Sequence, residues 1–257
     1  MKISILTLFP EMYDGFLNTS IIKRAISKKA VEIEILNIRD FTKDKYGRVD
    51  TPPVGGGAGL IMKCQPIIDC LNSIRTSSSH VILMSPRGKT FTQKKSHEYK
   101  DNYEHLIIIC GHYEGIDERI NDYVDELISI GDFILTGGEL ASMVISDSII
   151  RLLDGAITEQ STEEESFENG LLDYPQYTEP TEFDGKKIPD ILYSGNHTAI
   201  EKWRKKKSLE LTQKYRPDLF EKYPLTKQDQ KLLNEINDNV VGQWELDAIE
   251  KGKKFIK

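Results

Sequence analysis

LIIICG, at residues 106–111, is an uninterrupted apolar run that ends in a turn residue, and VILMS, at 81–85, has the same form. Such runs are typical of strands that are covered on both faces, as strands are in a parallel sheet. Two strand-like segments lie upstream of them, the apolar run at 3–9 and the alternating run VEIEI that begins at Val31. Together these segments predict a parallel sheet.

Helical patterns separate the predicted strands. Apolar residues recur at helical spacing after Pro10 and again from Glu139 to Leu153. Two short apolar runs, at 127–130 and 133–135, are split by a Gly-Asp pair. The alternation of strands and helices predicts an α/β domain over residues 1–158.

The chain changes character after this domain. Residues 159–184 hold nine acidic residues and no basic one, whereas residues 186–216 hold nine basic residues against three acidic ones. We interpret 159–185 as an acidic interdomain loop, because a segment of this length without a helical pattern is commonly a functional loop or a linker. Helical patterns at 198–215, 227–237 and 240–251 then predict a small all-helical domain over 186–257.

The overall composition limits the possible partners. The chain has 34 Lys and Arg residues against 41 Asp and Glu residues, a formal net charge of −7. Overall charge therefore excludes general coating of nucleic acid, and any contact with RNA must come from a local patch. The cluster WRKKK at 203–207 is a candidate for such a patch, although a solvated helix face is an equal alternative.

The sequence also predicts a location. No apolar stretch approaches the ~20 residues that cross a bilayer, and the N-terminus lacks the pattern of a secretory signal. Three cysteines without CxxC spacing argue against a zinc site or a disulfide framework. We expect a cytoplasmic protein without a membrane partner.

Three glycine-rich turns offer a candidate binding site, at 54–59, 110–115 and 131–138. Ligands of parallel α/β sheets bind at the carboxyl ends of strands, where glycine allows close approach to the backbone. Neither a GxGxxG motif after the first strand nor a GK[ST] motif is present, which argues against dinucleotide and P-loop sites. Ordinary turns are the alternative, but three such loops in one domain favour a small-molecule pocket.

Two side chains near these turns are candidates for a catalytic role. Cys110 ends a buried-looking strand, so a core thiol is a better interpretation than a nucleophile. His112 has the chemistry of an acid–base group, and it is equally compatible with a simple turn position.

Six motifs stand out along the chain: LTLFPEM (6–12), GGGAG (55–59), GHYEGIDERI (111–120), SIGDFILTGGEL (129–140), SFENGLLDYPQYT (166–178) and LYSGNHTAIEKWR (192–204). In this order they resemble the motifs of bacterial tRNA (guanine-N1)-methyltransferases, which methylate the guanosine 3′ of the anticodon. The similarity extends from about residue 1 to about residue 225. It implies a SPOUT methyltransferase domain with a deep C-terminal trefoil knot, S-adenosylmethionine as cofactor and a homodimer with active sites at the interface.

The same resemblance implies roles for individual residues. Glu165 falls at the position of the general base and Arg151 at that of its electrostatic partner. Magnesium is implied for turnover, without a protein metal cage. Lys202, Arg204 and Lys205 are expected to bind the anticodon branch of tRNA. The cofactor pocket is expected to comprise Ser85, Pro86, Gly111, Tyr113, Glu114, Ile130, Gly131, Asp132, Phe133, Ile134, Leu135, Gly137 and Gly138.

The chain departs from the family pattern at a few positions. The base position holds Glu165 where relatives carry aspartate, and Glu179 stands where they carry arginine. These changes keep two alternatives open: a knotted tRNA- and cofactor-binding protein with impaired catalysis, and a SPOUT methyltransferase that acts on another RNA.

Overall fold

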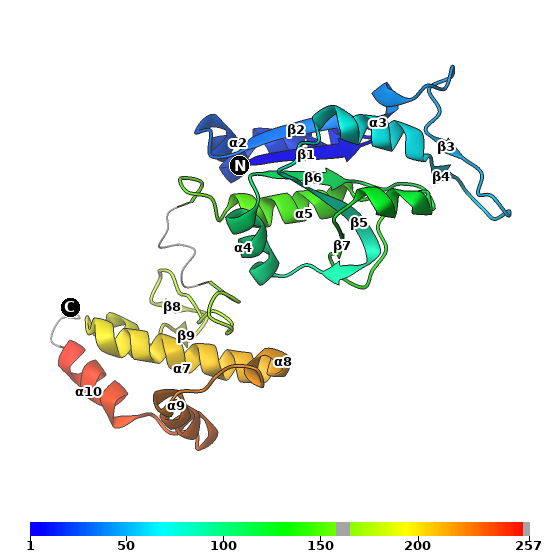
Figure 1. Ribbon diagram of the computed structural model, residues 1–257. Coiled ribbons are helices and arrows are strands. Elements are labelled where there is room, and N and C mark those ends of the chain that lie inside the picture. The colour runs from blue at the N-terminus through cyan, green and yellow to red at the C-terminus, as the bar shows by residue number, and fades with distance from the viewer. Residues whose placement is uncertain (158–164, 254–257) are drawn as a thin grey trace. The chain divides into compact units, whose positions relative to one another are not determined.

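A computed structural model describes residues 1–157 and 165–253 (Figure 1). The chain divides between Glu159 and Gln160 into two units, unit 1 before this point and unit 2 after it. Residues 159–164 of the predicted acidic loop and residues 254–257 of the predicted helical domain lie outside the described residues.

Unit 1 is built on a five-stranded sheet in which every neighbouring pair of strands is parallel, in the order β2-β1-β6-β5-β7. The predicted parallel sheet is thereby confirmed. Its strands are β1 (Lys2–Thr7), β2 (Glu32–Asn37), β5 (Ser79–Thr90), β6 (His105–Ile109) and β7 (Glu126–Ser129).

The two faces of this sheet bury alternate residues of each strand. In β6, Leu106 and Ile108 face one apolar core, whereas Ile107 and Ile109 face the other. Such alternation is the period-2 geometry of a strand, and it explains why a continuous apolar run is required here. Helices α2 (Ser20–Ser27), α4 (Gln93–Asn102) and α5 (Glu139–Ile150) supply residues to the first core, and α3 (Cys64–Ile74) supplies residues to the second (Figure 1).

Strand β5 is longer than the apolar run that predicts it. Its first part pairs with β7 up to Met84, and a second pairing begins at Lys89 after a shift of register. Residues 85–88 therefore bulge out of the ladder at the carboxyl end of the sheet. The apolar run at 133–135 forms no strand and lies in the loop that precedes α5.

Short elements complete unit 1. They are η1 (Pro10–Tyr13), α1 (Asp14–Asn18), η2 (Ile38–Phe41), η3 (Glu118–Tyr123) and the antiparallel pair β3 (Asp50–Thr51) and β4 (Ile61–Met62).

Unit 2 is mainly helical. Its long helix α7 (His197–Tyr215) packs with the others around two small apolar cores, one near Leu209 and one near Trp203. The third predicted helix begins at Gln243 rather than at residue 240, because Gly242 occupies the N-cap. The other elements are η4 (Asp190–Tyr193), α8 (Pro217–Phe220), α9 (Lys227–Asn237), α10 (Gln243–Gly252) and an antiparallel hairpin of β8 (Glu182–Phe183) and β9 (Lys186–Lys187).

Part of the predicted acidic loop packs against unit 2. Leu171 is buried with Leu209 of α7 and with Leu232 and Leu233 of α9. The backbone N–H of Leu172 donates to Thr212 Oγ1 at 2.8 Å. Composition suggests an exposed connection, but the apolar Leu-Leu pair within the acidic stretch anchors this part to the helices.

Candidate active site

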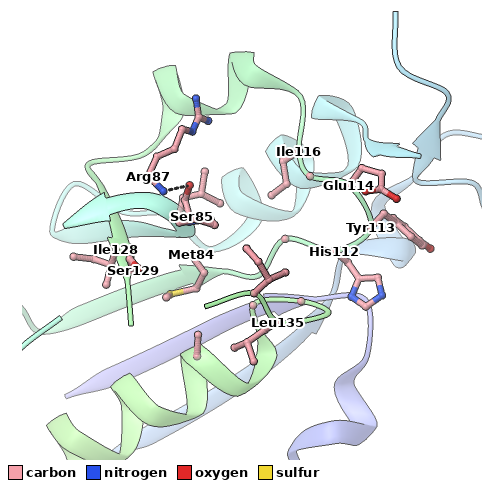
Figure 2. A pocket seen from close by; sticks show the side chains of 18 of the residues that line it. Met84, Ser85, Arg87, His112, Tyr113, Glu114, Ile116, Ile128, Ser129 and Leu135 are labelled. Carbon is pink, nitrogen blue, oxygen red and sulfur yellow. Dashed lines mark hydrogen bonds between the residues drawn. The ribbon is translucent and has the colours of Figure 1, made fainter. Parts of the chain in front are cut away.

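A cavity of about 580 Å³ opens at the carboxyl ends of β5, β6 and β7 in unit 1 (Figure 2). Ligands of parallel α/β sheets bind at this edge. Segments far apart in the sequence meet there: residues 83–87, 111–118, 128–131 and 133–138, with Ile61, Asn121 and Ala141.

Close backbone packing shapes one wall of this pocket. The N–H of Gly138 donates to the carbonyl oxygen of Gly111 at 2.8 Å. A Cβ on Gly138 would lie 2.8 Å from Cys110 Cα and 3.1 Å from Met84 Cβ, which is too close. Glycine is therefore required where α5 begins, and the GG pair of the sequence motif has a steric reason.

The predicted cofactor residues converge on this cavity. All of them line it except Asp132, which is exposed. Their roles as cofactor ligands remain a prediction, but four separate stretches of sequence contribute to one pocket.

The pocket combines an apolar interior with a charged rim. Leu83 and Ile128 are buried beneath it. At the rim, the Arg87 guanidinium donates to both carboxylate oxygens of Glu118, each at 2.9 Å. The Arg119 guanidinium beside Asp117 holds the pKa of that carboxyl well below its usual range. Figure 2 shows Arg87 and Ser85 on one side of the pocket, and Tyr113 with His112 at the other.

Sequence reasoning missed several residues that line the pocket. Arg87 follows the Ser85-Pro86 pair directly, and Asp117 and Glu118 lie inside the GHYEGIDERI motif. Adjacency to predicted residues was the signal that could have found them.

Cys110 lies in the core of unit 1. Its side chain is fully buried, and burial raises the pKa of the thiol to about 12. Its Sγ lies 3.5 Å from the hydroxyl of Tyr13. A thiol held in its protonated form is a poor nucleophile, so the geometry favours the core role.

The two predicted catalytic residues belong to different units. Arg151 is half-buried at the C-cap of α5 in unit 1, where its N–H donates to the carbonyl oxygen of Asp147 at 3.1 Å. Glu165 lies in unit 2, at a smaller cavity of about 160 Å³. That cavity is lined by Glu165, Asn169, Leu171, Leu172, Asp173, Tyr174, Glu201, Arg204, Lys205 and Ser208.

The predicted RNA-binding cations contact aromatic rings of unit 2. The ammonium of Lys202 lies 4.2 Å from the centre of the Trp244 ring, and the guanidinium of Arg204 lies 4.6 Å from that of Tyr174. Lys205 Nζ donates to the hydroxyl of Tyr223 at 2.6 Å. Arg204 and Lys205 line the cavity that also holds Glu165, Asp173 and Glu201, so three carboxylates and two cations share one surface.

Within residues 1–157 and 165–253, no group of three or more His, Cys, Asp or Glu side chains has the geometry to hold a metal ion. In the same described ranges, no helix has both the length and the apolar character that crossing a membrane requires.

A parallel α/β sheet with a glycine-lined pocket at its carboxyl edge defines, as a class, an enzyme-type fold that binds a small molecule. Comparison with known proteins narrows this class. The model of the family described as tRNA (Guanine-1)-methyltransferase TrmD matches residues 1–222. The chain belongs to this family and is a methyltransferase, which confirms the resemblance of the motifs.

Individual relatives are similar over most of their length. A tRNA (guanine-N(1)-)-methyltransferase of Ureaplasma urealyticum serovar 10 is 55% identical over 223 residues, which cover 87% of this chain and 98% of that protein. The enzyme of the same name from Clostridium botulinum strain Langeland is 53% identical over 239 residues, with 92% and 99% covered. The one from Malacoplasma penetrans is 54% identical over 223 residues, with 87% and 98% covered.

Proposed function

We propose that the chain transfers a methyl group from S-adenosylmethionine to N1 of the guanosine next to the anticodon of tRNA. The observation that carries this proposal is the convergence of the predicted cofactor residues on one cavity, in a chain of the tRNA (guanine-1)-methyltransferase family. The protein works in the cytoplasm, where its tRNA substrate is found.

The residues of the unit 1 pocket fit the proposed cofactor. Leu83, Ile128 and Ala141 offer apolar surface for an adenine ring, and Ser85 and Glu114 offer polar groups for a ribose and an amino acid moiety. Bound there, S-adenosylmethionine supplies an electrophilic methyl group on a sulfonium. Glycine at positions 111 and 138 lets the neighbouring residues pack closely in the pocket wall.

The chemistry at guanine requires a base and a cation, and the family resemblance supports Glu165 and Arg151 in these roles. N1 of guanine carries a proton at neutral pH, and this proton must leave as the nitrogen attacks. Glu165 accepts it as general base, and the guanidinium of Arg151 stabilises the negative charge that develops on O6. Glutamate keeps the carboxylate chemistry of the aspartate that the family pattern carries at this position.

Unit 2 provides the proposed contact with RNA. Lys202, Arg204 and Lys205 lie on α7, and two of them share a cavity with Glu165. Cations on this helix attract the phosphates of the anticodon branch. Magnesium serves turnover at the protein, the RNA or the reacting groups.

A homodimer with active sites at its interface is supported by apolar surface on unit 1. Leu140 and Val144 are 49% and 52% exposed and lie one turn apart on α5, and Ile134 is 84% exposed on the preceding loop. Exposed apolar residues at this spacing suit a second copy of the chain. The SPOUT knot is proposed for the same region, where residues 130–131 and 133–138 line the pocket together with residues 85–87 of the bulge.

Mass spectrometry of nucleosides tests this function. The purified protein is incubated with S-adenosylmethionine carrying a labelled methyl group and with a tRNA transcript, and the tRNA is then digested. Labelled 1-methylguanosine is the expected product. Label on a ribose or only on ribosomal RNA would replace the proposal by that of a methyltransferase for another RNA.

A protein that binds tRNA and cofactor with impaired catalysis is the second candidate, motivated by Glu165 and Glu179, two positions at which the chain departs from the family pattern. Retardation of the anticodon stem-loop in a gel, without any label in the RNA, would establish it.

A further inference from the structure

A buried carboxylate lies behind the wall of the unit 1 pocket. Glu139, the first residue of α5, is only 2% exposed, and the hydroxyl of Thr7 donates to its Oε1 at 2.8 Å. Thr7 is itself fully buried at the end of β1. Burying a carboxylate is costly unless its oxygens are satisfied, and the N-terminus of a helix offsets only part of that cost. The second oxygen, Oε2, therefore matters.

That oxygen faces an imidazole. Glu139 Oε2 lies 3.9 Å from Nδ1 of His112, and this nitrogen is buried without a hydrogen-bond partner among the described residues. A separation of 3.9 Å is longer than a hydrogen bond and within the range of an electrostatic contact. A Cβ on Gly137 would collide with both atoms, so glycine at this position allows the carboxylate and the imidazole to face each other.

His112 joins the two loops that form the pocket wall through its backbone. His112 and Gly137 make an isolated antiparallel bridge. The His112 ring packs between Phe9, at a centroid distance of 4.6 Å, and Tyr113, at 4.9 Å and nearly perpendicular. Tyr113 lines the pocket with a φ of +58°, a left-handed conformation that a non-glycine residue keeps only when its surroundings hold it.

We propose that Glu139 is a positioning residue, whose carboxylate orients the imidazole of His112 and through it fixes Tyr113 and the pocket wall in the geometry that binds the cofactor. Nδ1 of His112 carries the hydrogen that faces Glu139. The inference rests on the proposed function only in taking this pocket as the cofactor site. No contact of Glu139 with cofactor or substrate is involved.

Steady-state kinetics with Glu139→Gln tests the role. Glutamine keeps the volume of glutamate and an oxygen for Thr7, but it removes the charge that faces His112. The KM for S-adenosylmethionine rises about tenfold, as expected when a buried polar group loses its partner. The kcat and the KM for tRNA stay within about twofold, since no reacting group is touched. An unchanged KM for the cofactor, or a loss confined to kcat, would overturn the proposal.

A double-mutant cycle with His112→Asn distinguishes positioning from two independent defects. If Glu139 acts through His112, the double variant has the same cofactor affinity as the single variant that binds the cofactor less tightly. A loss of cofactor affinity in the double variant equal to the product of the two single losses would overturn the proposal. Should Glu139→Gln fail to fold, nitrogen NMR of the His112 ring in the wild-type protein decides instead: a hydrogen on Nδ1 is expected, and a hydrogen on Nε2 alone contradicts the proposal.

A matched control is available elsewhere in the sheet. Glu126 is a partly buried carboxylate of β7, bonded to the Tyr99 hydroxyl at 2.6 Å and away from the pocket lining. Glu126→Gln is expected to lower the melting temperature and to leave the KM for the cofactor unchanged. Calorimetry of cofactor binding to the same variants tests the positioning role of Glu139 separately from the proposed function. It reports on the pocket even if the wild-type protein methylates no tRNA.

Discussion

In unit 1 the proposed ligand residues lie on turns after strands, and their side chains contribute little to the core, whereas in unit 2 the proposed RNA-binding cations are also part of the packing. Lys205 donates to the Tyr223 hydroxyl, and Lys202 lies over Trp244. Pocket walls made of backbone tolerate few substitutions at glycine. Cations with two roles can be changed only with consequences for both stability and binding.

Substitution of the proposed base in unit 2 is expected to have the largest effect, because it slows methyl transfer and leaves cofactor binding in unit 1 unchanged. In Glu165→Gln, methyl transfer in a single turnover is expected to slow by roughly 10²–10⁴-fold, because the N1 proton loses its acceptor. Cofactor affinity, measured by calorimetry, stays at the wild-type value since Glu165 belongs to unit 2. Glu168→Gln is the neighbouring control, with wild-type rates expected. Methylation at full speed in Glu165→Gln would remove this residue from the role.

A larger side chain in the pocket wall of unit 1 is expected to weaken cofactor binding and to leave tRNA binding unchanged. Gly138→Val places a branched side chain against Cys110 and Met84, so cofactor affinity falls at least about tenfold. Affinity for tRNA is retained, which gel retardation checks. Gly15→Ala in α1 is a suitable control, because a Cβ there meets no atom within 4 Å. Normal cofactor binding by Gly138→Val would show that the cavity is not the cofactor site.

Replacement of a buried lysine of unit 2 is expected to lower the free energy of unfolding. Lys206 is 7% exposed, with Nζ 2.9 Å from Glu235 and 3.7 Å from Glu245. Lys206→Met removes the cation beside both carboxylates, leaves Glu235 with the N–H of Trp244 at 3.0 Å, and is expected to cost about 3 kcal/mol of unfolding free energy. Urea denaturation measures this loss, and cofactor affinity provides the control. A stability equal to wild type would contradict the structural role assigned to Lys206.

The smallest expected effect concerns a cation with two roles. Lys205→Ala is expected to weaken tRNA binding a few-fold and to reduce the slope of log K against log salt by about 1, as for one lost phosphate contact. Titrations at several salt concentrations give the slope. Lys100→Ala in α4 of unit 1 is the matched control, with an unchanged slope. An unchanged slope in Lys205→Ala as well would assign this lysine to packing alone.

The sequence was informative about unit 1 because its signals are local. Continuous apolar runs such as 106–111 report burial on both faces, and the GG pair before α5 reports close packing of backbone. The bulge at 85–88 could not be foreseen, since it depends on a second pairing of β5 with β7. Glu139 was equally hidden, because its partners Thr7 and His112 are distant in sequence.

Prediction was weaker for unit 2. Charge counting identified the cluster at 203–207 but not which lysine is buried: Lys206 lies among carboxylates, one residue from Lys205. The helical period alone does not predict which lysine is buried, because its burial depends on where α9 and α10 pack against α7. The roles of Glu165 and Arg151 came from the family resemblance, and no spacing in the sequence connects them.

The central claim is that the cofactor pocket of one unit and the carboxylate of the other serve one reaction in a dimer. Co-expression of Gly138→Val and Glu165→Gln chains with different affinity tags yields mixed dimers for a methylation assay. If each active site combines groups from two subunits, the mixed dimer contains one site with both groups intact, and 1-methylguanosine is formed although neither parent variant makes it efficiently. A mixed dimer as inactive as its parents would contradict this account.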